Sequence, residues 1–116
     1  MRDMDIVSAL IGFKSGEKAA RDGVLIGITA QPEDATAAVG AKAYFTVTAL
    51  GENLSYQWQY STDNGETWAD TSLTGNKTAT LTVNATATRN GYQYRCAVTS
   101  DGGSIISGVA TLTVTE

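Results

Sequence analysis

Residues 92–98 read Tyr92-Gln93-Tyr94-Arg95-Cys96-Ala97-Val98, and they follow directly on the turn signal Asn90-Gly91. This stretch is predicted to form a strand over residues 92–100, because aromatic and β-branched residues favour strands and Asn-Gly favours a tight turn. Cys96 is the only cysteine in the chain. No internal disulfide is therefore available, and the fold must be held together by packing.

Strand-like segments separated by turn signals continue on both sides of this stretch. Their spacing of roughly ten residues is typical of an all-β sandwich. Apolar and polar residues alternate in several of them, so each offers one face to a core and one to water. The gaps between segments are too short for the helical crossovers of parallel sheets, which predicts two stacked antiparallel sheets. The predicted strands cover residues 25–30, 35–39, 42–50, 55–61, 67–69, 78–83, 92–100 and 109–115.

Trp58 and the stretch 92–98 together resemble the core pattern of immunoglobulin-like (Ig-like) domains. In that family a Trp on the third strand packs between the sheets, and a Tyr two residues before the sixth-strand Cys forms a tyrosine corner. The resemblance implies these roles for Trp58, Tyr94 and Cys96, and it places Val47 where the second-strand cysteine is missing. It predicts an Ig-like antiparallel β-sandwich of about seven to eight strands. The expected core is Phe45, Val47, Trp58, Leu81, Tyr94, Cys96 and Leu112.

Residues 55–68, 79–83 and 92–98 look more closely like the Ig-like modules of bacterial surface proteins and of tailed-phage structural proteins. This resemblance covers residues 28–116. It is specific for the fold and says little about function, since such modules bind many things or nothing.

Residues 61–68 also fit the Ser-x-Asp-x-Gly-x-Thr-Trp box of sialidase-type propellers. A propeller needs several blades and the chain carries one copy, so we interpret the box as turn chemistry. Asp63 is expected to bind nearby amides, Gly65 to supply a positive φ, and Trp68 to pack over the hairpin. Weak glycan stacking is an alternative for the aromatic residues Trp68, Tyr44 and Tyr60.

Composition argues against several classes of function. The net charge of −4 and the scattered Lys and Arg residues disfavour nucleic acid, and no apolar run is long enough to span a membrane. Histidine is absent, so neither a Ser-His-Asp triad nor a His-metal site can form. Glu33 and Asp34 are expected to be solvated in a loop, and Gly102-Gly103 to lie in a hairpin. We predict a protein that is not an enzyme and has no cofactor and no metal.

Residues 1–23 differ from the rest and are predicted to be an N-terminal extension in front of a sandwich over residues 24–116. The extension lacks the pattern of a cleaved export signal, which predicts synthesis and retention in the cytosol. On a helix its apolar residues would form one stripe, followed by a polar connector. This stripe is the predicted partner-binding segment, which contacts a capsid or tail protein or other copies of the chain: Ile6, Val7, Leu10, Ile11 and Phe13.

These features predict a non-enzymatic phage virion accessory protein, a capsid decoration or tail-associated protein that is made in the host cytosol and located in the virion. The alternative is a bacterial cell-surface adhesin or glycan-binding Ig-like module that belongs to a longer protein.

Overall fold

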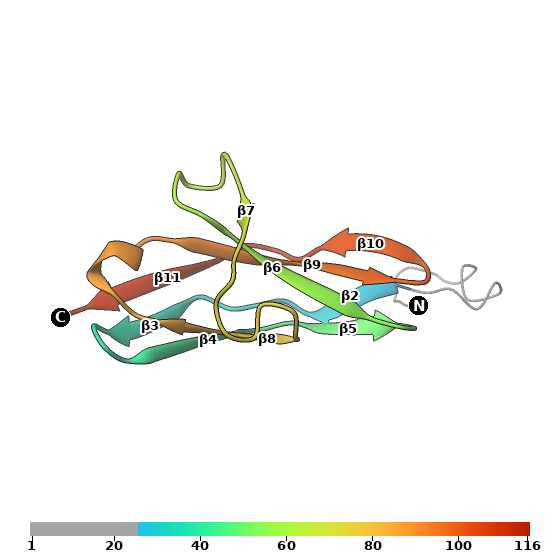
Figure 1. The fold of residues 1–116 in the computed structure, drawn as a ribbon, viewed down its shortest axis with the longest axis horizontal. Helices are drawn as coiled ribbons and strands as arrows, with labels where there is room; N and C mark the ends of the chain where they lie inside the picture. Colours follow the sequence, from blue (N-terminus) through green and yellow to red (C-terminus); the bar gives the residue numbers. More distant parts are fainter. Residues whose placement is uncertain (1–25) are drawn as a thin grey trace.

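The computed structural model describes residues 26–116, and this part of the chain consists of short strands and one 3₁₀ turn (Figure 1). The elements are β2 (Ile26–Ala30), β3 (Ala35–Ala38), β4 (Lys42–Thr46), β5 (Thr48–Gly51), β6 (Ser55–Ser61), β7 (Ala69–Asp70), β8 (Thr80–Asn84), η2 (Ala87–Arg89), β9 (Gln93–Ser100), β10 (Gly103–Ile106) and β11 (Ala110–Thr115). The predicted extension over residues 1–23 lies outside the described residues.

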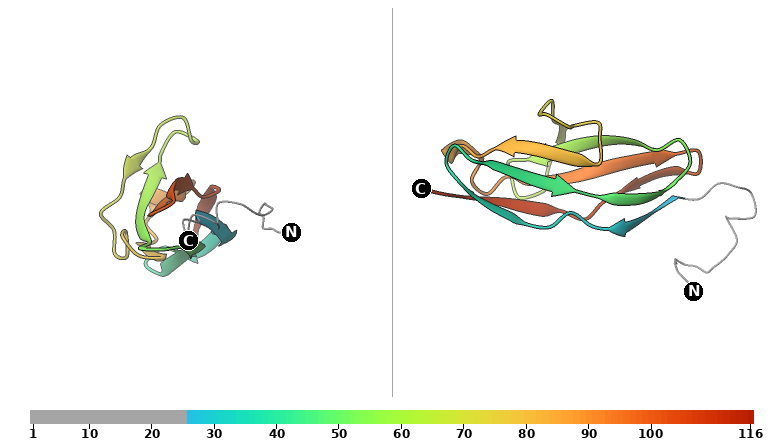
Figure 2. Two further views of the ribbon diagram at one scale, coloured as in Figure 1. Left: turned by 90° about the vertical axis from the view of Figure 1, so that its right-hand side faces the viewer. Right: turned by 90° about the horizontal axis from the view of Figure 1, so that it is seen from below.

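The strands form two layers (Figure 2). One layer is a sheet of order β3-β11-β9-β6-β7, in which β10 also pairs with β9. The other layer contains the pairs β2-β5 and β4-β8, and β4 runs into β5 through Val47. The predicted all-β sandwich is confirmed.

Three details differ from the prediction. β3 and β11 pair in parallel. Parallel neighbours need a long connection between them, and here the strands from β4 to β10, which lie between them in the sequence, provide it. The expected strand over residues 42–50 divides at Val47, where its partner changes from β8 to β2. β10 was not predicted; it forms a hairpin with β9 through the turn that contains Gly102.

The core lies between the layers, around the pair formed by Trp58 on β6 and Cys96 on β9. Both side chains are fully buried, and the rings of Phe45 and Tyr94 stack with their centroids 5.0 Å apart. Every residue of the expected core is buried: Phe45, Val47, Trp58, Leu81, Tyr94, Cys96 and Leu112. Because Val47 and Cys96 are both buried without a disulfide, packing alone fills this layer.

The connection from β7 to β8, residues 71–79, covers the free side of β6. The Trp58 amide donates to the Asn76 carbonyl at 2.8 Å, and the indole Nε1 of Trp58 donates to the Thr78 carbonyl at 2.8 Å. Gly75 allows this close approach: its φ is +81°, and an added Cβ would overlap the Thr80 carbonyl oxygen. The connection therefore satisfies both N–H groups of Trp58 while it passes from one layer to the other.

The described residues form an elongated body of 50 × 24 × 22 Å. β2 begins at one end of the long axis and the C-terminus lies at the other (Figures 1 and 2). The chain thus enters and leaves the sandwich at opposite ends.

Candidate functional site

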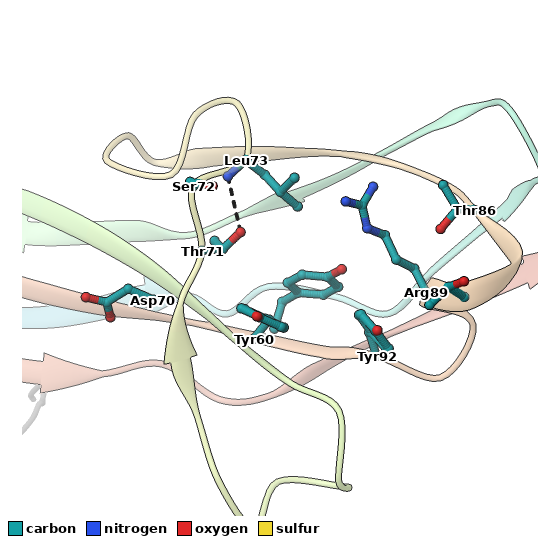
Figure 3. Close-up of a pocket in the computed structure, with 10 residues that line it drawn as sticks. Tyr60, Asp70, Thr71, Ser72, Leu73, Thr86, Arg89 and Tyr92 are labelled. Atoms are coloured by element: carbon teal, nitrogen blue, oxygen red, sulfur yellow. Dashed lines mark hydrogen bonds between the residues drawn. The ribbon is translucent and has the colours of Figure 1, made fainter.

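A hollow of about 390 Å³ opens where β6, β7 and η2 approach one another (Figure 3). We call it the tyrosine hollow. Arg89 extends from η2 toward Leu73, and Tyr60 and Tyr92 lie along another side (Figure 3). The lining consists of three tyrosines, one acid, one base, four hydroxyl side chains and one leucine: Tyr60, Tyr92, Tyr94, Asp70, Arg89, Thr71, Ser72, Thr86, Thr88 and Leu73.

The strand pairing and one tight turn bring these residues together. Tyr60 on β6 is in register with Tyr94 on β9, and the rings of Tyr60 and Tyr92 stack with centroids 6.2 Å apart. The turn around η2 places Arg89, whose Nη1 donates to the Asn84 carbonyl at 2.8 Å. The Tyr92 amide in turn donates to the Arg89 carbonyl at 3.0 Å. The walls of the hollow are therefore built from backbone that is itself hydrogen-bonded.

Tyr94 is 1% exposed, yet its hydroxyl has no hydrogen-bond partner among residues 26–116. The tyrosine corner implied by the Ig resemblance would bond this hydroxyl to the nearby backbone, and that bond is missing from the described part of the chain. Burial raises the pKa of Tyr94 to about 12, although the nearby Arg89 guanidinium acts in the opposite direction. Tyr94 therefore stays protonated near neutral pH and can donate a hydrogen bond.

The outer face of the β6-β9 pair carries a chain of polar contacts beside the hollow. Arg95 donates from Nε to Oε1 of Gln59 at 2.9 Å, and Gln59 donates from Nε2 to Oδ1 of Asp70 at 3.1 Å. The Arg95 guanidinium carbon lies 4.2 Å from the centroid of the Trp68 ring. Trp68 is thus half-buried under a cation, which leaves it a poor platform for a sugar.

The turn over residues 61–68 has the chemistry that its sequence predicts. The Asp63 carboxylate accepts from the side chain and the amide of Thr67 and from the Ser61 hydroxyl. These bonds, led by the one from the Thr67 side chain, lower the pKa of Asp63 to about 2. Gly65 has a φ of +89°, and its carbonyl accepts from the indole Nε1 of Trp68. The box therefore orders a hairpin.

Tyr44 is the most open of the aromatic residues considered for glycan stacking, with 59% of its surface exposed. It projects from β4 between two shallow hollows, of about 340 and 450 Å³. Asp34, at the first of these hollows, accepts from the Thr111 amide at 2.8 Å, so this carboxylate fastens a loop to β11.

The described residues contain neither a metal-ligand cluster nor an activated thiol. No group of three His, Cys, Asp or Glu residues that could hold a metal ion occurs within residues 26–116. Burial raises the pKa of the Cys96 thiol to about 11, which makes it a poor nucleophile. In the same range no helix is long and apolar enough to cross a membrane.

The predicted partner-binding residues lie outside the described part of the chain: Ile6, Val7, Leu10, Ile11 and Phe13. The sequence reasoning singled out Tyr60 and Tyr94 but missed Arg89, Tyr92 and the hydroxyl residues of the hollow. The available signal was weak, because residues 86–91 are typical of an ordinary turn and their proximity to Tyr60 depends on the pairing of β6 with β9.

Comparison with solved structures shows the Ig fold. The titin M3 domain matches with a TM-score of 0.61 and 18% identity, over 80% of this chain and 99% of that one. The N-terminal eight Ig domains of Down Syndrome Cell Adhesion Molecule match with a TM-score of 0.62 and 21% identity, over 78% and 12%. Dpr1 IG1 bound to DIP-eta IG1 matches with a TM-score of 0.56 and 17% identity, over 79% and 97%.

Comparison with curated proteins finds endoglucanase C of Cellulomonas fimi, which is 43% identical over 88 residues. The match covers 75% of this chain but only 8% of that enzyme. A family model matches residues 27–116, which is nearly the whole described sandwich. The chain thus belongs to the family described as a domain of unknown function (DUF8696), whose fold in this chain is an Ig-like β-sandwich.

Proposed function

We propose that this chain is a non-catalytic Ig-like module of a bacterial surface or secreted protein. The module spaces neighbouring parts of the protein and offers its side faces for contact with a protein or a glycan. The observation that carries the proposal is the 43% identity to an 88-residue segment within a much longer bacterial enzyme.

The size of that segment argues for a module separate from the catalytic machinery. It spans 8% of endoglucanase C, about the size of one Ig-like sandwich. Glycoside hydrolysis needs a pair of carboxylates that flank the scissile bond, and in our chain the hollow beside β6 is lined by a single acid, Asp70. Hydrolysis by endoglucanase C is therefore assigned to other parts of that enzyme.

The shape of the sandwich supports a spacer. The described chain enters at one end of a 50 Å axis and leaves at the other, so a module inserted in series adds its length to the protein. The side faces of the sheets remain available for contacts. A structural relative, Dpr1 IG1, is bound to another Ig domain, which supports a protein as one class of partner.

The virion role predicted from the sequence receives no support from the comparisons, which favour the bacterial surface alternative. The anchoring role of the stripe Ile6, Val7, Leu10, Ile11 and Phe13 stays a prediction. Its test is removal of residues 1–23, followed by a measurement of binding to phage particles. Unchanged binding would end the anchoring hypothesis.

A chimeric enzyme tests the module. The matching segment of endoglucanase C is replaced by residues 27–116 of this chain, and hydrolysis of a soluble cellulose derivative is measured. If the segments are equivalent modules, the chimera is exported, folded and as active as the parent enzyme. The matched control is the same chimera with Trp58→Ala, which should lose its folded module. A folded chimera with no activity would show that the segment takes part in catalysis.

A further inference from the structure

The tyrosine hollow contains hydrogen-bonding groups that the protein itself leaves unused. The clearest is the Tyr94 hydroxyl, which is buried and has no partner within the described residues. Buried polar groups in folded proteins are nearly always hydrogen-bonded, so an exception at the wall of a hollow indicates a partner from outside the chain.

Arg89 adds further donors beside this hydroxyl. One of its N–H groups donates to the Asn84 carbonyl, and a guanidinium carries five in all. Arg89 and Tyr94 line the same hollow. Both therefore present donors to the same space.

The remaining lining combines rings with hydroxyls. Tyr60 and Tyr92 are half-buried, so part of each ring stays accessible in the hollow. Around them lie Thr71, Ser72, Thr86 and Thr88, and each hydroxyl can donate one hydrogen bond and accept two. The volume of about 390 Å³ falls within the range of small-molecule sites, about 300–1,000 Å³.

We propose that the tyrosine hollow binds one sugar ring of a saccharide, with the Tyr94 hydroxyl and Arg89 bonded to ring hydroxyls and with Tyr60 or Tyr92 against the apolar face of the ring. A sugar ring presents vicinal hydroxyls and an apolar C–H face together, which matches this lining. This inference rests on the proposed function and names the ligand class for one of its side faces.

Charge and topology disfavour other ligands. Arg89 is the single cation of the lining and already donates to the Asn84 carbonyl, so the hollow lacks the cluster of cations that would select a bare anion. An extended peptide would need an open strand edge, whereas β6 is paired with β9 on one side and covered on the other by residues 71–79.

The test is a titration of the full ¹⁵N-labelled chain by NMR with two probes, cellotriose and trigalacturonic acid. We expect amide shifts to change for Arg89, Tyr92 and the segment 71–73 with at least one probe. The two arms separate a neutral from an acidic sugar. If neither probe changes the amide shifts of these residues, the proposal is wrong.

Two variants examine the contacts, and a third serves as the control. Arg89→Gln and Tyr94→Phe should each raise Kd by about tenfold or more, because each removes a buried bond to the ligand. Tyr44→Phe, on the opposite sheet, should leave Kd unchanged. A loss of binding in Tyr44→Phe equal to that in Arg89→Gln would place the sugar elsewhere and refute the hollow.

Tyr94→Phe also separates a binding role from a structural one. An unpartnered hydroxyl contributes nothing to the fold, so the variant should melt at or above the temperature of the parent while it loses affinity. A clear fall in melting temperature would mean that the hydroxyl is bonded within the fold, and the proposal would fail. If neither sugar binds while the endoglucanase chimera stays folded and active, the saccharide site is wrong and the module role stands.

Discussion

Two buried aromatic residues of this sandwich differ in whether their polar groups are hydrogen-bonded within the described residues. Trp58 and Tyr94 are both at most 1% exposed and lie on the paired strands β6 and β9. The indole N–H of Trp58 donates to the Thr78 carbonyl at 2.8 Å, whereas the Tyr94 hydroxyl has no partner within residues 26–116. Trp58 belongs to a closed core that defines the fold, and Tyr94 lies where the same core opens into a hollow. The hydrogen-bonded indole of Trp58 thus belongs to the structural part of this interior. The Tyr94 hydroxyl, which lacks a partner within residues 26–116, belongs to the part that is suited to a ligand.

The largest expected effect is at Trp58. Trp58→Ala removes a fully buried ring and leaves the Thr78 carbonyl without its donor, so unfolding should become easier by about 3–5 kcal/mol. A domain of ordinary stability would be close to unfolding. Urea denaturation followed by circular dichroism measures the change. The matched control is Trp68→Ala, which removes a half-buried ring and should cost less. Equal losses at the two positions would contradict the distinction between them.

The next largest loss of stability is expected in the connection over residues 71–79. Its first residues line the hollow, and its later residues accept hydrogen bonds from Trp58. Gly75→Ala should cost about 2–4 kcal/mol, because the left-handed φ of +81° and the overlap with the Thr80 carbonyl add together. Gly40→Ala is the control: its φ is +92° but nothing lies within 4 Å, so only the backbone term of about 1 kcal/mol applies. Thermal unfolding should show a larger loss of stability for Gly75→Ala than for Gly40→Ala. The reverse result would mean that the backbone around Gly75 packs more loosely than in the structure.

The sequence predicted the closed core better than the hollow for a physical reason. The alternation of Phe45 and Val47, the position of Trp58 and the Tyr94-x-Cys96 pattern all report on burial, which has the same two-residue period along every strand. The hollow depends on Arg89 and Tyr92 of one turn meeting Tyr60 and Thr71 across the sheet. That meeting is set by strand register and by the path of a long connection, and neither leaves a periodic signal in the sequence.

Asp63 extends the comparison to the surface, where a polar group is fully satisfied but exposed. Its folded-state pKa of about 2 lies below the ordinary 3.8, so its contribution to stability is present above about pH 3.8 and is lost as the pH falls toward 2. Thr67→Val removes the hydroxyl that contributes most to this shift, and the pKa should rise toward 3.8. An NMR titration of the Asp63 carboxyl measures it. An unchanged pKa would mean that the Thr67 amide or the Ser61 hydroxyl, and not the Thr67 hydroxyl, lowers the pKa of Asp63.

The last prediction concerns the reactivity of Cys96, which is in register with Trp58 in the closed core. Because burial raises the pKa of its thiol to about 11, the folded protein should react with a disulfide reagent at pH 8 only when the core opens. The rate should then be about a thousandfold or more below that of the protein in denaturant. Trp58→Ala should speed the reaction strongly, whereas Tyr94→Phe should not, since its hydroxyl faces the hollow and not the closed core. A fast reaction in the parent protein would show that the core around Trp58 and Cys96 is open to solvent, and the contrast with the hollow would disappear.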